Sequence, residues 1–234
     1  MCWSIMHKSI RNSLRLLFLL VVVIVLGAVV LLSYGLIIKS QAEALLKDLT
    51  AIKVGLSTGT EANLFAQKHQ GLLFQVSEPC NSDSCSRIFR LQNTWLSTSR
   101  LEPLAEFRVN ISVKNGTVDS IGAFLFRAMP ISPTFDASAG VVDEYVELPR
   151  HGHYYFPTPV GKPYLKVVLD SHADPVQRQH AFAFSFRCLV KPGGCDLPCD
   201  YLPFAWQDWK IHLQQASFAG DFNSYYPKGG RCKP

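Results

Sequence analysis

The stretch FRVNISVKNGTVDSIGAFLFR, residues 107–127, decides the fold that this sequence predicts. Apolar residues alternate with polar ones in its first half, a period of two that is typical of a strand with one buried face: Phe107, Val109, Ile111 and Val113. Asn115 and Gly116 follow, and this pair favours a type I′ turn. Thr117 to Arg127 then returns as a second strand. The stretch therefore predicts an antiparallel hairpin with one apolar and one polar face.

Three further segments read as strands of the same antiparallel sheet. They are Val141 to Leu148, Tyr164 to Asp170 and Ala181 to Cys188, the last with three phenylalanines at alternate positions. A sheet with one apolar face needs a cover, and the segment before the hairpin supplies helices for it. The predicted fold class is therefore α+β, an antiparallel sheet covered by one or two helices.

The helical signals lie between residues 39 and 70. Leu45, Leu49, Ile52 and Leu56 recur at spacings of four, three and four residues, the period of an amphipathic helix that continues an apolar run before it. Gly55 is a plausible stop. Thr58 and Glu61 form a capping-box pattern that starts a second helix, which we expect to run to about His69. A short third helix is expected from Pro203 to Leu213, with its tryptophans packed in the core.

Leu16 to Ile38 is an apolar run without a charged residue. At about 1.5 Å per helical residue it exceeds the roughly 30 Å of a bilayer's hydrocarbon core, which predicts a transmembrane helix. A cleaved signal peptide is the competing interpretation, with Ser40 and Ala42 as small residues before a cleavage point, but its apolar region is usually only about 7 to 15 residues long. We favour an uncleaved signal anchor.

The flanks of this run predict its orientation. Three basic residues precede it, Lys8, Arg11 and Arg15, whereas basic and acidic residues largely cancel after it. We therefore expect residues 1–15 in the cytoplasm and the rest of the chain exported, in a bacterial inner membrane with a periplasmic domain. The chain has 23 basic and 18 acidic residues, so the part beyond residue 38 carries 20 basic and 18 acidic ones. With so little excess charge and no basic stripe, we expect no nucleic acid as partner.

Six of the seven cysteines lie on the side expected to be exported: Cys80, Cys85, Cys188, Cys195, Cys199 and Cys232. An even number in an oxidising compartment favours disulfides over a zinc site or a redox centre, because neither a second zinc knuckle nor a Cys-x-x-Cys motif accompanies them. Six cysteines allow about 15 pairings. Proximity favours Cys80 with Cys85, Cys188 with Cys195, and Cys199 with Cys232. Cys2 is expected as a free cytoplasmic thiol.

Two loops offer ligands for a borderline metal such as zinc: His151, His153, Asp170, His172 and Asp174. The simpler interpretation is that Asp, Ser and Pro form a turn between strands and that the histidines are exposed. We prefer that interpretation, and we predict no catalytic residue, metal or cofactor. Residues 55–59 match G-x-S-x-G, but no preceding parallel strands support a nucleophile elbow there.

The sequence predicts the following organisation: residues 1–15 cytoplasmic, 16–38 transmembrane, 39–70 juxtamembrane helical, 71–213 an exported α+β domain, and 214–234 an irregular, disulfide-tethered tail. We favour a structural or protein-interaction module of the cell envelope over an enzyme, and we expect its partners to be the membrane and an envelope protein. Binding would use the outer face of the sheet or the tyrosine-rich loops with Tyr154, Tyr155, Tyr225 and Tyr226. The alternative is a metal-assisted exported hydrolase built on the histidine and aspartate loops.

Overall fold

The computed structural model describes residues 2–77, 80–81, 83–94, 104–128, 135–144, 153–155, 164–170, 173–190 and 198–208. The predicted hairpin is confirmed as β3 (Leu104–Lys114) and β4 (Thr117–Ala128). Asn115 has φ 53° and Gly116 has φ 75°, the two left-handed conformations that a type I′ turn requires. Phe107 and Val109 are fully buried on the inner face.

The described strands form one sheet of seven in the order β1-β2-β3-β4-β5-β7-β6. The strands other than the hairpin are β1 (Leu73–Val76), β2 (Ser84–Gln92), β5 (Phe135–Glu144), β6 (His153–Tyr155) and β7 (Tyr164–Leu169). The expectation of a purely antiparallel sheet is wrong, because β5 pairs with β7 in parallel. The reason is topological: β6 takes the edge, and the chain returns antiparallel to it as β7, in the position between β5 and β6.

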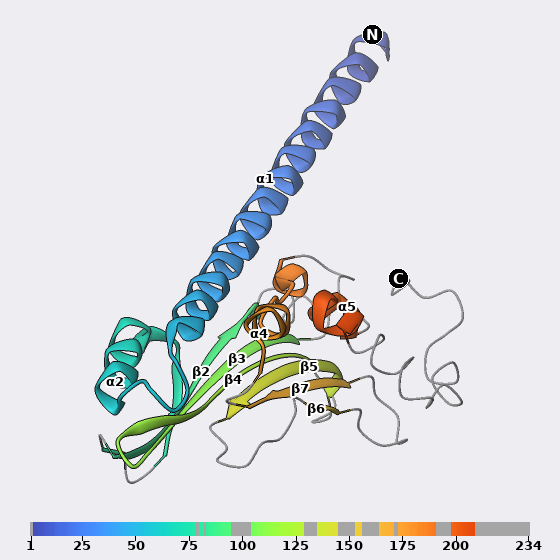
Figure 1. The fold of residues 1–234 in the computed structure, drawn as a ribbon. Coiled ribbons are helices and arrows are strands. Elements are labelled where there is room, and N and C mark those ends of the chain that lie inside the picture. Colours follow the sequence, from blue (N-terminus) through green and yellow to red (C-terminus); the bar gives the residue numbers. More distant parts are fainter. Residues whose placement is uncertain are drawn as a thin grey trace.

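Helices cover the inner face of this sheet (Figure 1). The covering elements are α1 (Cys2–Ala51), α2 (Gly59–Lys68), α4 (Pro175–Ala181), η2 (Phe186–Leu189) and α5 (Pro198–Tyr201). A short η1 (Gln70–Leu72) joins α2 to β1. Residues 203–208 are helical as well, and Trp206 is buried. The predicted cover by the helices of residues 39–70 is thus present, and elements from the C-terminal part extend it.

The predicted strand from Ala181 to Cys188 is wrong. Asp174 caps α4 by accepting from the Val176 N–H, and Pro175 stands in the first turn, so the chain enters this segment as a helix. The phenylalanines instead pack against the inner face of the sheet, where Phe107 makes T-shaped contacts with Phe184 at 5.5 Å and with Phe186 at 4.9 Å between ring centroids. The period of two therefore reflects contact with the core rather than strand pairing.

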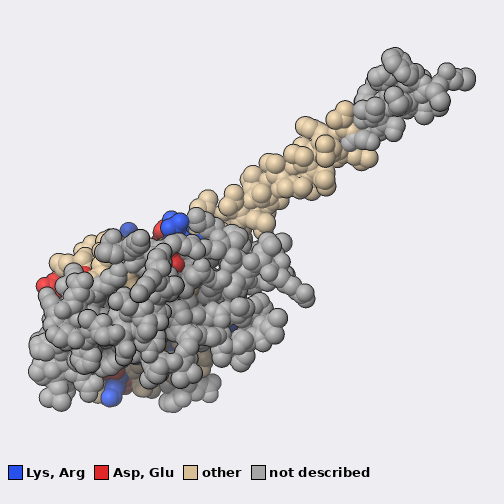
Figure 2. Space-filling view, turned by 90° about the vertical axis from the view of Figure 1, so that its right-hand side faces the viewer, with Lys and Arg blue, Asp and Glu red and all other residues tan. Residues whose placement is uncertain are grey.

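One continuous helix, α1, runs from the projecting N-terminal part into the core of the domain (Figure 1). Its segment Leu14–Ala51 is long and apolar enough to cross a membrane. In Figure 2 the described projecting part between the domain and the grey tip is tan, without Lys, Arg, Asp or Glu colours. Farther along, one face is buried, with Ala42, Leu45 and Leu49 at 0% exposure. The same helix therefore has an exposed apolar half and a core-forming half.

Contacts between α1 and the domain begin before Ile38. Gly35 is buried, and a Cβ placed there would lie 3.0 Å from the carbonyl oxygen of Val190. The exposed uncharged part is consequently residues 16–33, about 27 Å at 1.5 Å per residue, which still matches a hydrocarbon core.

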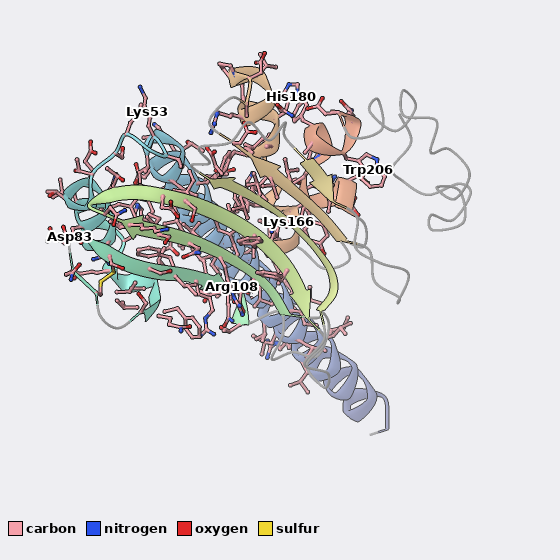
Figure 3. All side chains as sticks on the ribbon, turned by 60° about the horizontal axis from the view of Figure 1, so that its bottom comes forward. Lys53, Asp83, Arg108, Lys166, His180 and Trp206 are labelled. Carbon is pink, nitrogen blue, oxygen red and sulfur yellow. A yellow bond between two sulfur atoms is a disulfide. The ribbon has the colours of Figure 1, made fainter. Side chains whose placement is uncertain are left out.

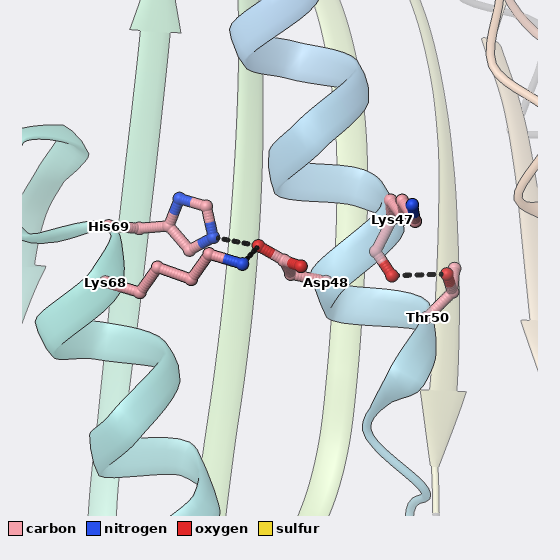
Figure 4. A network of polar contacts seen from close by, with 5 residues as sticks. All are labelled: Lys47, Asp48, Thr50, Lys68 and His69. Atoms are coloured by element: carbon pink, nitrogen blue, oxygen red, sulfur yellow. Dashed lines mark hydrogen bonds and ion pairs between the residues drawn. The ribbon is translucent and has the colours of Figure 1, made fainter.

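The capping box predicted at the start of the second helix is confirmed, whereas the first helix was expected to continue to Gly55 but ends at Ala51, and Leu56 is 75% exposed. Thr58 and Glu61 form the capping box reciprocally at the start of α2. Asp48 on α1 then binds the C-terminal end of α2, since its Oδ2 lies 2.7 Å from Lys68 Nζ and 2.7 Å from His69 Nε2 (Figure 4). The hydrogen bond from Lys68, with that from His69, lowers the pKa of Asp48 below its ordinary value against the opposing effect of burial. These contacts fasten α2 to α1.

Cys80 and Cys85 form the predicted short-loop disulfide, with Cα atoms 4.4 Å apart. Cys199 is disulfide-bonded too. The predicted pairs Cys188–Cys195 and Cys199–Cys232 each include a cysteine outside the described ranges, and these pairings stay predictions. Residues 209–213 of the expected third helix and the tail 214–234 also lie outside them.

Candidate binding surface on the outer face of the sheet

The outer face of the sheet carries one ordered row of side chains across five strands. Direct register pairs connect neighbouring members: Arg90 with Arg108, Arg108 with Phe124, Phe124 with Gly140, and Gly140 with Lys166. We call these five residues the cross-strand row. Three cations and one aromatic ring therefore lie side by side on one surface.

Glycine at position 140 allows the ring of Phe124 to lie flat on the backbone. A Cβ at Gly140 would lie 2.1 Å from Phe124 Cδ1, and one at Gly122 would lie 2.9 Å from Phe124 Cε2. Phe126 continues this aromatic surface, with its ring 5.9 Å from that of Phe124 and nearly parallel to it. Two glycines on adjacent strands thus form the seat of an aromatic platform.

The two arginines of the row are held by different neighbours. Arg90 stacks over Phe74 of β1, with its guanidinium carbon 3.7 Å from the ring centroid. Arg108 donates through Nε to Glu106 and lies 5.1 Å from the centroid of Phe126. Gln92 donates to the other oxygen of the same buried carboxylate. The two arginines of the row are therefore each held by a described neighbour.

Figure 3 views the sheet from this side: Arg108 and Lys166 are labelled over the strands, and α1 passes behind them. Among the described residues no helix lies on this face (Figure 1). Two arginines directly opposite each other on neighbouring strands repel, which costs stability. Of the described acidic side chains, only Glu106 is ion-paired with a member of the row, through Arg108. The row can therefore bind a negatively charged surface whose planar groups stack on Phe124 and Phe126.

The residues predicted as metal ligands are only partly described. Asp174 is the N-cap of α4, and Asp170 is buried with its backbone carbonyl accepting from Ala173 and Arg178. His151 and His172 lie outside the described residues, and His153 belongs to β6. No group of three potential metal ligands occurs within the described part of the chain. The metal-assisted hydrolase stays a prediction.

The tyrosine-rich loops are described only through β6, which contains Tyr154 and Tyr155, while Tyr225 and Tyr226 lie outside the described ranges. The sequence placed Arg108 on the polar face of a strand, but it did not predict β2 and so missed Arg90. An inward-facing Arg87 hides the alternation of β2, since its neighbours on that face are Cys85 and Phe89. Burial lowers the pKa of Arg87, which reaches Asn63 of α2.

No protein-family model matches this chain, and comparisons with curated proteins and with solved structures find no match either.

Proposed function

We propose that this chain is a single-pass membrane protein whose domain is exported and binds an acidic partner of the cell envelope through the cross-strand row. The observation that carries the proposal is the row itself, with Arg90, Arg108 and Lys166 aligned in register around a flat phenylalanine. Cations fixed beside aromatic rings are a common composition of interface centres, where arginine and aromatic residues are enriched.

The anchor supports this proposal through its stiffness. A helix that continues without a break from an apolar, exposed segment into the core gives the domain a fixed height and tilt relative to a bilayer. Three basic residues before the apolar segment favour a cytoplasmic N-terminus. In a bacterial inner membrane the domain would then be periplasmic, where Cys80 and Cys85 would remain oxidised.

Charge reversal at the row tests the binding function. In Arg90→Glu with Lys166→Glu, neither side chain leaves a described ion pair behind, so we expect the domain to fold and binding to be lost. The control is Lys53→Glu with Lys114→Glu, the same charge change at two exposed sites outside the row. Proteins are cross-linked in intact cells and quantified after purification of the chain from membranes. A partner set unchanged by the row variant would refute the proposal.

Thiol labelling in intact cells tests the topology separately. Cys2 should react with a membrane-permeant maleimide and not with an impermeant one, whereas a cysteine introduced at the exposed Thr60 should react with both. Labelling of Cys2 by the impermeant reagent would reverse the proposed orientation.

A further inference from the structure

A cleft of about 1070 Å³ lies on the opposite, inner side of the sheet. It is bounded by α1, by the loop of residues 52–56 that follows it, by β4 and β5, and by residues 178–186. The walls are mainly apolar and partly aromatic: Leu46, Ile52, Val54, Ile121, Phe182 and Phe184. The volume and the lining are those of a site for a small organic molecule.

An ion pair lies at the base of the cleft. Arg178 of α4 donates through Nη1 to Asp143 Oδ2 and through Nη2 to the backbone carbonyl of Asp170. The Asp143 side chain is only 5% exposed. Its other oxygen, Oδ1, is buried, and no hydrogen-bond partner reaches it in the described structure. A buried carboxylate oxygen without a donor is costly, so a donor supplied by a ligand would be stabilising there.

The rim of the cleft is basic. Lys47 and Lys53 line it, and neither forms an ion pair with a described acidic residue. The acid at the rim, Glu43, lies 3.5 Å from Lys39 and is partly neutralised by it. Figure 3 shows Lys53 projecting at the edge of the domain.

We propose that this cleft binds one amphipathic anion that carries a hydrogen-bond donor. Its apolar body packs against Phe182 and Phe184, its acidic group lies against Lys47 and Lys53, and its donor completes Asp143 Oδ1. Either a single-chain lipid or a small aromatic acid has this chemistry. The site shares no residue with the cross-strand row and does not depend on it.

The probe for this site is 6-anilinonaphthalene-2-sulfonate, which combines two aromatic groups with a sulfonate and one N–H donor at opposite ends of the naphthalene. The full chain in neutral detergent is titrated, and one-to-one complexes are counted by native mass spectrometry. Lys47→Ala with Lys53→Ala should weaken binding about tenfold, because two charge-assisted contacts are removed at exposed positions. The control, Arg15→Ala with Lys114→Ala, removes the same charge at two exposed residues that do not line the cleft and should bind like the wild type.

A change in the ligand tests Asp143 without perturbing the fold. The phenoxy analogue of the probe, with an ether oxygen in place of the N–H, should bind about tenfold more weakly to the wild-type chain. Displacement of the probe by a lysophosphatidylglycerol or by indole-3-acetate distinguishes the lipid from the aromatic acid. Equal affinity in the lysine variant and the wild type, or displacement by neither compound, would overturn the proposal. The probe titration is independent of the partner-binding test, because Arg90→Glu with Lys166→Glu changes no residue of the cleft and should leave the affinity for the probe unchanged.

Discussion

Gly140 and Phe124 face each other across β4 and β5, and their contact allows a sharp test at the scale of one residue. In Gly140→Ala the new Cβ would lie 2.1 Å from Phe124 Cδ1, so the ring must leave its seat. We expect a loss of about 1 to 3 kcal/mol in the free energy of unfolding, the usual cost of overpacking. Gly71→Ala is the control, because nothing lies within 4 Å of its added Cβ. Thermal unfolding of the two variants measures the difference; equal midpoints would contradict the described seat.

Asp48 makes stability depend on pH at the junction of α1 and α2. Its pKa is lowered in the folded state, mainly by the hydrogen bond from Lys68, so the unfolded chain binds a proton more readily. The stabilisation is complete above the ordinary aspartate pKa of about 3.9 and is lost as the pH falls through the lower folded value. Asp48→Asn should therefore unfold more easily at pH 7 by about 1 kcal/mol.

The measurement for Asp48 is the unfolding midpoint of both chains between pH 3 and pH 7. The gap between wild type and variant should narrow towards pH 3, because protonation removes the charge that Lys68 binds. A gap independent of pH would show that the carboxylate's charge does not contribute. Lys114→Ala, at an exposed residue that forms no described ion pair, serves as the control for a general charge effect.

Local signals in single residues were predictive here. Asn115 with Gly116 and Thr58 with Glu61 have their geometry fixed by backbone contacts within three or four residues, and both were confirmed. Asp143 was missed, although a signal existed. It occupies an inward position of β5, two residues after the buried Val141, where an apolar residue is expected. Such a break in alternation depends on knowing the strand's register, which sequence alone did not supply.

At the scale of elements, most of those that the sequence predicted have a partner next to them in the chain; the exception is the predicted strand from Tyr164 to Asp170, which is β7 and pairs with β5 beyond β6. The β3–β4 hairpin and the α1–α2 pair have such partners, whereas β2 pairs with β3 across a long connection. β2 is a strand that was not predicted, whereas the segment after α4 was predicted as a strand and is not one. Its alternating phenylalanines have the period of a strand, but the segment pairs with no described strand. Its described structure depends on contacts with Phe107 and on a hydrogen bond from Ser185 to the Tyr201 carbonyl, which are distant in sequence.

The docking of η2 on α1 gives a test at the element scale. Gly35→Leu would push a side chain against the Val190 backbone, 3.0 Å from a Cβ at that position, whereas Gly27 on the same helix has open space around it. We expect Gly35→Leu to lower the stability of the domain by about 1 to 3 kcal/mol and Gly27→Leu to leave it unchanged. Hydrogen exchange of residues 38–49 should accelerate only in the first variant. Equal protection in both would mean that the two elements are not packed as described.

At the scale of the whole molecule, α1 has an exposed apolar half and a half that forms part of the domain's core. This division predicts where the chain can be shortened. Beyond residue 33 it contributes four buried apolar side chains to the core: Ile38, Ala42, Leu45 and Leu49. Burying the three larger side chains contributes about 1.5 to 3 kcal/mol each, a sum comparable to the whole stability of a domain. A chain of residues 34–234 should therefore fold without detergent and unfold cooperatively. A chain of residues 50–234 still contains the segments that form the sheet and α2, but we expect it not to fold. If it unfolded cooperatively at the same temperature as residues 34–234, α1 would be only an anchor.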